Sequence, residues 1–214
     1  MSAITKELER LVSSELLKKF QEAIEKGIVK RMDIEEIRLL SGEILNPDRV
    51  EIRRLKDMKG VYSSDEAWRL MDPETVVYRV HRKSYEELFY GVTEILPGKV
   101  GDEYFMTKGH FHQRVGAPGI CVFLAGRGAM VLQHQDEKLP FMVAPVERGT
   151  ICYEPGYYAH RAVNLGPEKL IYVSIAATDS GWDYGLIEKK GLRYLIVEKQ
   201  GKATIMENPR YSKI

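Results

Sequence analysis

The sequence contains little that a secreted, membrane-embedded or nucleic-acid-binding protein would require. Its 214 residues include two cysteines, too few for a disulfide framework, so we expect reduced thiols and a cytoplasmic protein. No apolar run approaches the length of a membrane span, and the charged segment after Met1 lacks the apolar region of a signal peptide. Lysine and arginine together number 32, and aspartate and glutamate number 31, which argues against nucleic acid or a membrane as a partner.

The chain is expected to form one main domain with an N-terminal appendage. Apolar residues recur mostly at three- and four-residue steps over residues 5–26, which predicts an amphipathic helix that ends at Gly27. This helix either packs on its own domain or forms a dimer contact. We therefore divide the chain into a helical extension, residues 1–28, and a main domain, residues 29–214.

From about residue 75 onward, short β-branched and aromatic runs separated by glycine and proline replace the helical pattern. They recur at 76–80, 88–95, 120–124, 129–133 and 170–175, and a late hairpin is expected around Gln200 and Gly201. Evenly spaced short strands predict an all-β barrel or sandwich. A short capped helix is expected before them, at residues 64–71.

Two of the five histidines, His110 and His112, are separated by a single residue. On a β-strand such residues point to the same face, so the pair would direct two imidazoles into one space. A third histidine, His160, follows a Pro-Gly turn between strand-like runs. Three imidazoles suit a first-row metal ion, whereas His81 and His134 are expected to be surface or hydrogen-bonded structural residues.

Longer motifs around these histidines resemble the archaeal cupin-type glucose-6-phosphate isomerases. The resemblance covers about residues 30–214, and Thr-Lys-Gly-His-Phe-His is far more specific than His-x-His. Its stretches are Pro97–Gly101, Phe105–His112, Gly149–Thr150, Tyr157–Asn164 and Asp183–Gly185. The resemblance implies a cupin double-stranded β-helix, which is a jelly-roll barrel. It further implies a homodimer that interconverts glucose 6-phosphate and fructose 6-phosphate in glycolysis or gluconeogenesis.

The resemblance also implies roles for individual residues. The ligands of one divalent metal ion (iron, manganese, zinc or nickel) would be His110, His112 and His160. The groups that hold the phosphate of a phosphorylated sugar would be Thr93, Thr107 and Gly109. Hydroxyls and a free backbone N–H can donate to phosphate oxygens, which fits this role. The aromatic residues near the substrate would be Tyr78 and Tyr184, and the candidate catalytic side chains are Tyr157 and Tyr184.

Four positions depart from the pattern of the family. The family has a metal-binding glutamate seven residues after the second histidine of the pair, where this chain has Gly119. Cys121, Ala176 and Trp182 replace two tyrosines and a histidine. Water or a Cys121 thiolate could fill the ligand position, or Cys121 could be a small buried side chain.

Because the glycine side chain can neither bind metal nor move a proton, the sequence is compatible with three functions. One alternative is a sugar-phosphate isomerase. Another is a non-catalytic cupin that binds metal and sugar phosphate, and a third is a metal cupin with a different reaction.

Overall fold

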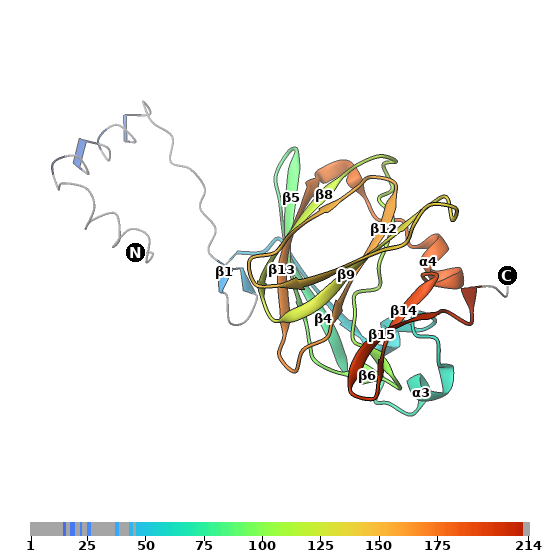
Figure 1. The fold of residues 1–214 in the computed structure, drawn as a ribbon. Helices are drawn as coiled ribbons and strands as arrows, with labels where there is room; N and C mark the ends of the chain where they lie inside the picture. The colour runs from blue at the N-terminus through green and yellow to red at the C-terminus, as the bar shows by residue number, and fades with distance from the viewer. Residues whose placement is uncertain are drawn as a thin grey trace. The chain divides into compact units, whose positions relative to one another are not determined.

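The computed structural model describes residues 15, 18, 19, 22, 25, 26, 37, 38, 43, 44 and 46–211. The chain separates into two compact units, Met1–Glu35 and Glu36–Ile214 (Figure 1). In the first unit, the described residues up to Glu25 have helical backbone, and Lys19 Nζ lies 2.8 Å from Glu15 Oε1. The rest of the helix predicted over residues 5–26, and the predicted domain boundary after residue 28, lie outside the described residues.

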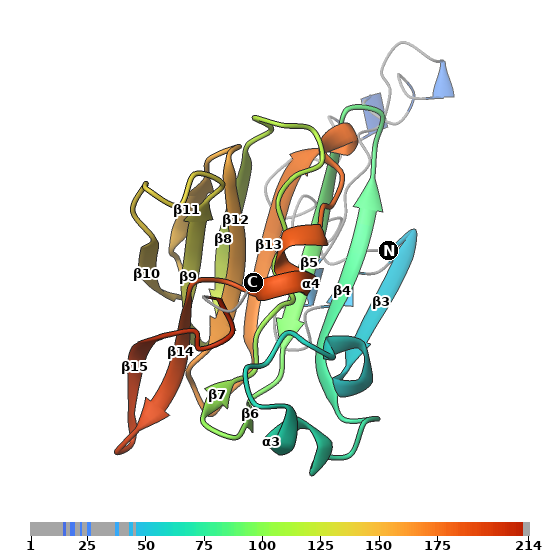
Figure 2. The same cartoon turned by 90° about the vertical axis from the view of Figure 1, so that its right-hand side faces the viewer.

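The second unit is built mainly from antiparallel β-strands, and its largest sheet has six of them in the order β11-β8-β13-β5-β4-β3. These strands are β3 (Arg49–Arg54), β4 (Val76–Ser84), β5 (Leu88–Ile95), β8 (Gly119–Ala125), β11 (Ile151–Glu154) and β13 (Leu170–Ala177). A second sheet has the order β10-β9-β12. Its strands are β9 (Arg127–His134), β10 (Met142–Glu147) and β12 (Tyr158–Asn164). Figure 2 shows the strands β13, β5, β4 and β3 of the large sheet following one another across the view.

The remaining elements are short. A four-stranded sheet contains β6 (Lys99–Val100), β7 (Glu103–Tyr104), β14 (Tyr194–Lys199) and β15 (Lys202–Glu207), and a separate pair contains β1 (Ile37–Arg38) and β2 (Glu43–Ile44). The helices are η1 (Leu55–Met58), α3 (Asp65–Arg69), η2 (Thr178–Ser180) and α4 (Gly185–Lys190). Among the described residues, no helix is both long enough and apolar enough to cross a membrane. The expectation of a mainly β protein is confirmed.

Local sequence signals explain two of these elements. The Ser64 side chain accepts a hydrogen bond from the Ala67 backbone N–H at 3.1 Å, which caps α3 as the sequence predicts. The hairpin of β14 and β15 turns at Gln200 and Gly201, whose φ angles are 53° and 73°. Two central residues with positive φ form the turn that matches the twist of a two-residue hairpin.

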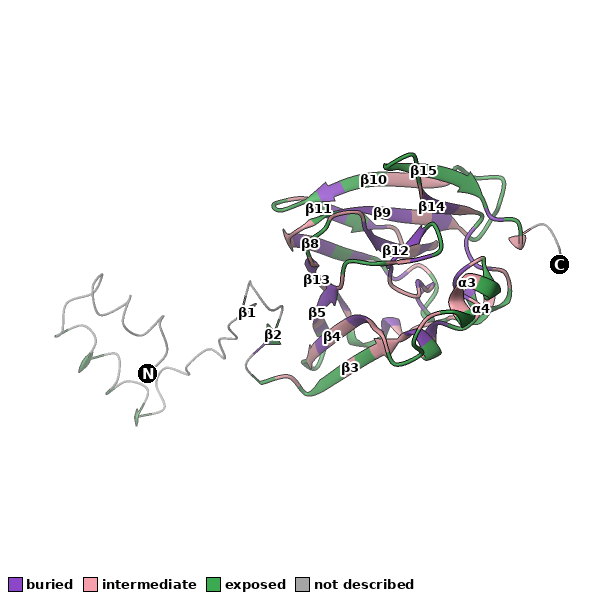
Figure 3. Cartoon of the chain, turned by 90° about the horizontal axis from the view of Figure 1, so that it is seen from below, coloured by how far each residue is buried: buried purple, intermediate pink, exposed green. Residues whose placement is uncertain are grey.

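The two faces of the large sheet have different surroundings. Val92 and Val173 are register partners on β5 and β13, and they pack in a small apolar cluster with Ile44. The next pair, Thr93 and Tyr172, points to the opposite face and lines an internal cavity. Successive side chains of a strand alternate in direction, and Figure 3 shows β5 and β13 largely buried, in keeping with cover on both faces. The alternation therefore places a hydroxyl and a phenol inside the fold while the same strands bury valines on the other side.

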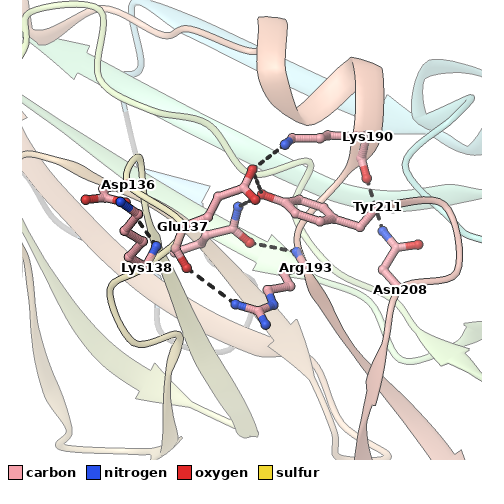
Figure 4. Close-up of polar contacts among 8 residues, drawn as sticks. Asp136, Glu137, Lys138, Lys190, Arg193, Asn208 and Tyr211 are labelled. Carbon is pink, nitrogen blue, oxygen red and sulfur yellow. Dashed lines mark hydrogen bonds and ion pairs between the residues drawn. The ribbon is translucent and has the colours of Figure 1, made fainter. Parts of the chain in front are cut away.

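A polar network attaches α4 and the C-terminal residues to the turn between β9 and β10 (Figure 4). The Glu137 carboxylate accepts hydrogen bonds from Lys190 Nζ and, at 2.8 Å, from the Tyr211 hydroxyl. Asn208 Nδ2 donates to the Lys190 carbonyl at 3.2 Å. The hydrogen bond from Lys190 lowers the pKa of Glu137. The network holds α4 in place, and α4 begins directly after Tyr184.

Candidate metal centre and substrate cavity

The three predicted metal ligands come together because two extended segments run side by side. His160 lies on β12, and His110 forms an isolated antiparallel bridge with it. The His110 carbonyl accepts from the His160 backbone N–H at 3.1 Å. His112 follows on the same extended segment, which is paired through single bridges and is not a regular strand. The predicted same-face placement of His110 and His112 is nevertheless obtained.

The geometry of the triad fits a metal ion. The ligand atoms of His110, His112 and His160 all lie within 4.8 Å of one another. The Ala117 carbonyl accepts a hydrogen bond from His112 Nδ1 at 2.6 Å, which makes Nε2 the ring nitrogen directed to a metal ion. Burial, together with the neighbouring histidines, lowers the pKa of His110 well below its ordinary value, and burial also lowers the pKa of His160. These two imidazoles are therefore neutral near pH 7, the form that binds a divalent transition metal.

The same cavity brings together the residues predicted to contact the substrate. The predicted residues that line it with the three histidines are Tyr78, Thr93, Thr107, Gly109 and Tyr184. Tyr157 is not among the lining residues. Tyr157 as a whole residue is 54% exposed, and it lines a neighbouring depression with His112. His81 and His134 lie outside the cavity. His134 Nδ1 accepts from the Asp136 backbone N–H at 2.8 Å, as expected of a structural histidine, whereas His81 is buried and its Nδ1 has no hydrogen-bond partner within the described part of the chain.

The loop before the histidine pair is held from β12. Gly109 has a φ of +76°, and a Cβ there would lie 3.1 Å from the His160 carbonyl, so glycine is needed for both conformation and space. The Lys108 carbonyl accepts from Arg161 Nη2 at 2.7 Å. Thr107 Oγ1 accepts from the Ala162 backbone N–H at 3.1 Å. These contacts hold the loop beside the histidine triad, in the lining of the cavity.

Two phenols of the cavity are kept in their protonated form. Burial raises the pKa of Tyr78 to about 12, although the nearby Arg53 guanidinium acts in the opposite direction. Burial also raises the pKa of Tyr184, again against the effect of Arg53. The Tyr184 ring lies 5.7 Å from the ring of His110, between centroids. Both hydroxyls can therefore donate hydrogen bonds to a bound oxygen near neutral pH.

Sequence reasoning missed a group of charged residues in the lining. Arg53 and Glu51 come from β3 and Arg82 comes from β4. The Arg82 guanidinium lies 4.0 Å from the Trp182 ring centroid, a cation–π contact that fixes its direction. Glu51 lies 3.1 Å from Arg53 and 3.4 Å from Arg82. Tyr78 and Arg82 lie an even number of positions apart on β4, so their side chains point to the same face. This spacing was the sequence signal available for Arg82.

A second missed residue is Glu154, the last residue of β11. It is the register partner of Gly119 on β8, and its side chain lines the cavity beside the histidines. Its Oε1 accepts from Cys121 Sγ at 3.0 Å, and its Oε2 lies 3.8 Å from His160 Nε2. Burial, followed by the Glu154 charge, raises the pKa of Cys121 well above its ordinary value, so Cys121 is a buried thiol here. The sequence signal available for Glu154 was its two-residue spacing from Cys152, which places both side chains on one face of β11. These two residues pair with Gly119 and Cys121 of β8.

The family match and the related proteins carry the same name. Residues 52–212 match the family described as Glucose-6-phosphate isomerase (GPI). The chain is 38% identical over 174 residues to glucose-6-phosphate isomerase of Thermococcus litoralis, covering 78% of this chain and 90% of that protein. It is 41% identical over 166 residues to glucose-6-phosphate isomerase of Pyrococcus horikoshii, covering 75% and 87%.

Similarity also extends beyond the archaea. The putative glucose-6-phosphate isomerase 1 of Rhizobium meliloti is 37% identical over 168 residues, covering 74% of this chain and 78% of that protein. Oxalate decarboxylase of Bacillus subtilis aligns with 49% of this chain and 26% of its own, at 17% identity and a TM-score of 0.41, too low to support a conclusion. The family match and the identities to the archaeal proteins agree with the resemblance carried by the motifs around His110 and His160, so the chain belongs to the glucose-6-phosphate isomerase family.

Proposed function

We propose that this protein is a metal-dependent isomerase that interconverts glucose 6-phosphate and fructose 6-phosphate. The observation that carries the proposal is the shared cavity. It combines a triad of histidine ligands with hydroxyl and guanidinium groups that suit a phosphate. Isomerases related over most of this chain support the choice of substrate. We also infer that the antiparallel sheets form the cupin double-stranded β-helix, with residues 1–28 as a helical extension.

The sugar phosphate would bind with its phosphate toward the arginine and threonine side of the cavity. Arg53 and Arg82 carry two positive charges, and Glu51 balances one of them, so this group retains a net charge of about +1 (two guanidinium groups and one carboxylate). Thr93, Thr107 and the backbone N–H of Gly109 are candidate donors to the phosphate oxygens. Guanidinium groups strengthen this assignment because their planar donors match phosphate geometry.

The other end of the open-chain sugar would then lie at the histidines. His110, His112 and His160 would hold the divalent ion, which when bound would polarise the sugar oxygens at C1 and C2. The hydrogen bond from His112 to the Ala117 carbonyl orients one of these ligands before binding.

The tyrosines are proposed as hydrogen-bond donors. Tyr184 and Tyr78 stay protonated because burial raises the pKa of each, so each can donate to a sugar oxygen. Tyr184 is the better placed for the reacting end because its ring is close to His110. A catalytic role for Tyr157 stays a prediction, and its exposed position argues for a role outside the cavity.

The proposal is tested by following both sugar phosphates by NMR with metal-loaded protein. We expect conversion in either direction and its loss in His160→Ala. His134→Ala is the matched control because His134 lies outside the cavity, and it should retain wild-type turnover. Thermal stabilisation by the sugar phosphates without conversion would contradict the isomerase and support a binding protein.

The assembly and location are proposals as well. We expect a cytoplasmic homodimer, in keeping with the resemblance to the archaeal isomerases. Sedimentation of the purified chain would test the dimer, and a monomer at all concentrations would contradict it.

A further inference from the structure

Glu154 is a buried carboxylate of the cavity that no arginine neutralises. The residue is 3% exposed, and the basic side chain recorded beside it within the described part of the chain is the neutral imidazole of His160, whose Nε2 lies 3.8 Å from Oε2. Glu51, the other carboxylate in the lining, is paired with Arg53 and Arg82. A buried carboxylate is unfavourable unless it is paired or binds a metal ion. The thiol hydrogen bond from Cys121 supplies a proton donor to Glu154 but no positive charge.

The Glu154 carboxylate occupies the space that a side chain at position 119 would fill. A Cβ at Gly119 would lie 2.5 Å from Glu154 Oε2 and 3.5 Å from His112 Cε1. Gly119 is not among the glycines with positive φ, so its backbone conformation does not require glycine. Glycine is needed there because the Glu154 carboxylate fills the volume beside the triad. The two residues are complementary across one register pair of β8 and β11.

We propose that Glu154 is the fourth protein ligand of the metal site, supplied from β11 in place of the glutamate expected at position 119. Two ligand atoms about 2.1 Å from a tetrahedral ion lie roughly 3.4 Å apart. The 3.8 Å between Glu154 Oε2 and His160 Nε2 is close to that separation. The carboxylate adds a negative charge to the three imidazole ligands, which balances part of the charge of the cation, and the Cys121 thiol orients the carboxylate by donating to Oε1. This assignment rests on the metal site of the proposed function.

The first test is metal affinity measured by titration of Mn²⁺ into chelator-stripped protein. Glu154→Gln keeps the shape of the side chain and removes its charge, and we expect the affinity to fall at least about tenfold. Glu103→Gln is the matched control. Glu103 is equally buried, but it accepts from the Ser63 backbone N–H at 2.6 Å, away from the histidines. Wild-type Mn²⁺ affinity in Glu154→Gln overturns the assignment.

A second test separates a ligand from a structural carboxylate. In chelator, Glu154→Gln should melt at or above the wild-type temperature, because a buried charge without a cation has been removed. Glu103→Gln should melt lower, because its hydrogen bonds from Ser63 lose the charge of the carboxylate that accepts them. Lower melting of metal-free Glu154→Gln contradicts the ligand role.

A double variant keeps the assignment testable if Glu154→Gln does not fold. Gly119→Glu combined with Glu154→Ala moves the carboxylate to the opposite strand and should bind Mn²⁺ with nearly wild-type affinity. Affinity as low as in Glu154→Ala alone overturns the assignment.

Turnover measured on the same preparations separates the two proposals. Weak metal binding by Glu154→Gln, without any turnover by the wild type, supports the ligand and contradicts the isomerase. Wild-type turnover with unchanged Mn²⁺ affinity in Glu154→Gln contradicts the ligand alone. Absence of Mn²⁺ binding by the wild type contradicts both.

Discussion

Restoring the carboxylate at position 119 by itself is expected to damage the metal-free protein. The new Cβ of Gly119→Glu would lie 2.5 Å from Glu154 Oε2, so the two carboxylates would crowd one buried site. Two unit charges at roughly 4 Å repel by about 4 kcal/mol at an effective dielectric constant of about 20. One carboxyl group can take up a proton instead. Raising a glutamate pKa from about 4.3 to about 7 costs roughly 4 kcal/mol at pH 7 as well.

The assay for Gly119→Glu is thermal unfolding in chelator. At roughly 2–4 °C per kcal/mol for a domain of about 150–250 residues, the melting temperature should fall by about 8–16 °C. Mn²⁺ should recover part of the loss, because a cation between the carboxylates removes their repulsion. The matched control is Gly119→Glu with Glu154→Val, which leaves one carboxylate and should melt near the wild type. A melting temperature for Gly119→Glu within about 2 °C of the wild type would refute the packing of Glu154 against position 119.

Three further predictions concern the cavity. Arg82→Met should raise KM for glucose 6-phosphate by about tenfold or more in steady-state kinetics with little change in kcat, because a charge-assisted hydrogen bond contributes about 1.5–3 kcal/mol. A KM that stays at the wild-type value would remove Arg82 from phosphate binding. Metal-free protein should lose stability as the pH falls below about 6.5. Burial lowers the folded-state pKa of His110 and His160, so unfolding takes up protons in this range. Melting curves between pH 5 and 8 check this sign. Gly109→Ala should lower the free energy of unfolding by about 1–2 kcal/mol in urea, because its φ of +76° is left-handed.

The fold could be predicted where the sequence pattern is local. β-Branched and aromatic runs such as 88–95 became β5 with the expected bounds, and Gln200-Gly201 formed the expected turn between β14 and β15. The triad was predictable because His110 and His112 are two residues apart and His160 follows a recognisable turn. The segment that carries His110 is bridged and not a regular strand, yet the two imidazoles still share one space.

The missed residues depend on pairing between distant segments. Arg53 and Glu51 lie in a charged stretch without a clear period, and β3 reaches the cavity only through its register with β4. Glu154 reaches the triad because β11 pairs with β8, and a single residue of register shift would turn its side chain to the other face. Tyr157 shows that nearness in sequence does not by itself place a side chain in the cavity. It is near His160 in sequence, but its side chain is directed outward from the turn before β12.

The central claim is that the histidine triad holds an ion that the isomerisation requires. The most direct measurement is the rate of fructose 6-phosphate formation from glucose 6-phosphate, followed on one preparation with bound metal quantified. It is measured as loaded, after chelation, and after metal is added back. We predict loss of the rate on chelation, recovery on reloading, and no recovery in His112→Ala. A rate that persists in protein shown to be free of metal would contradict the account.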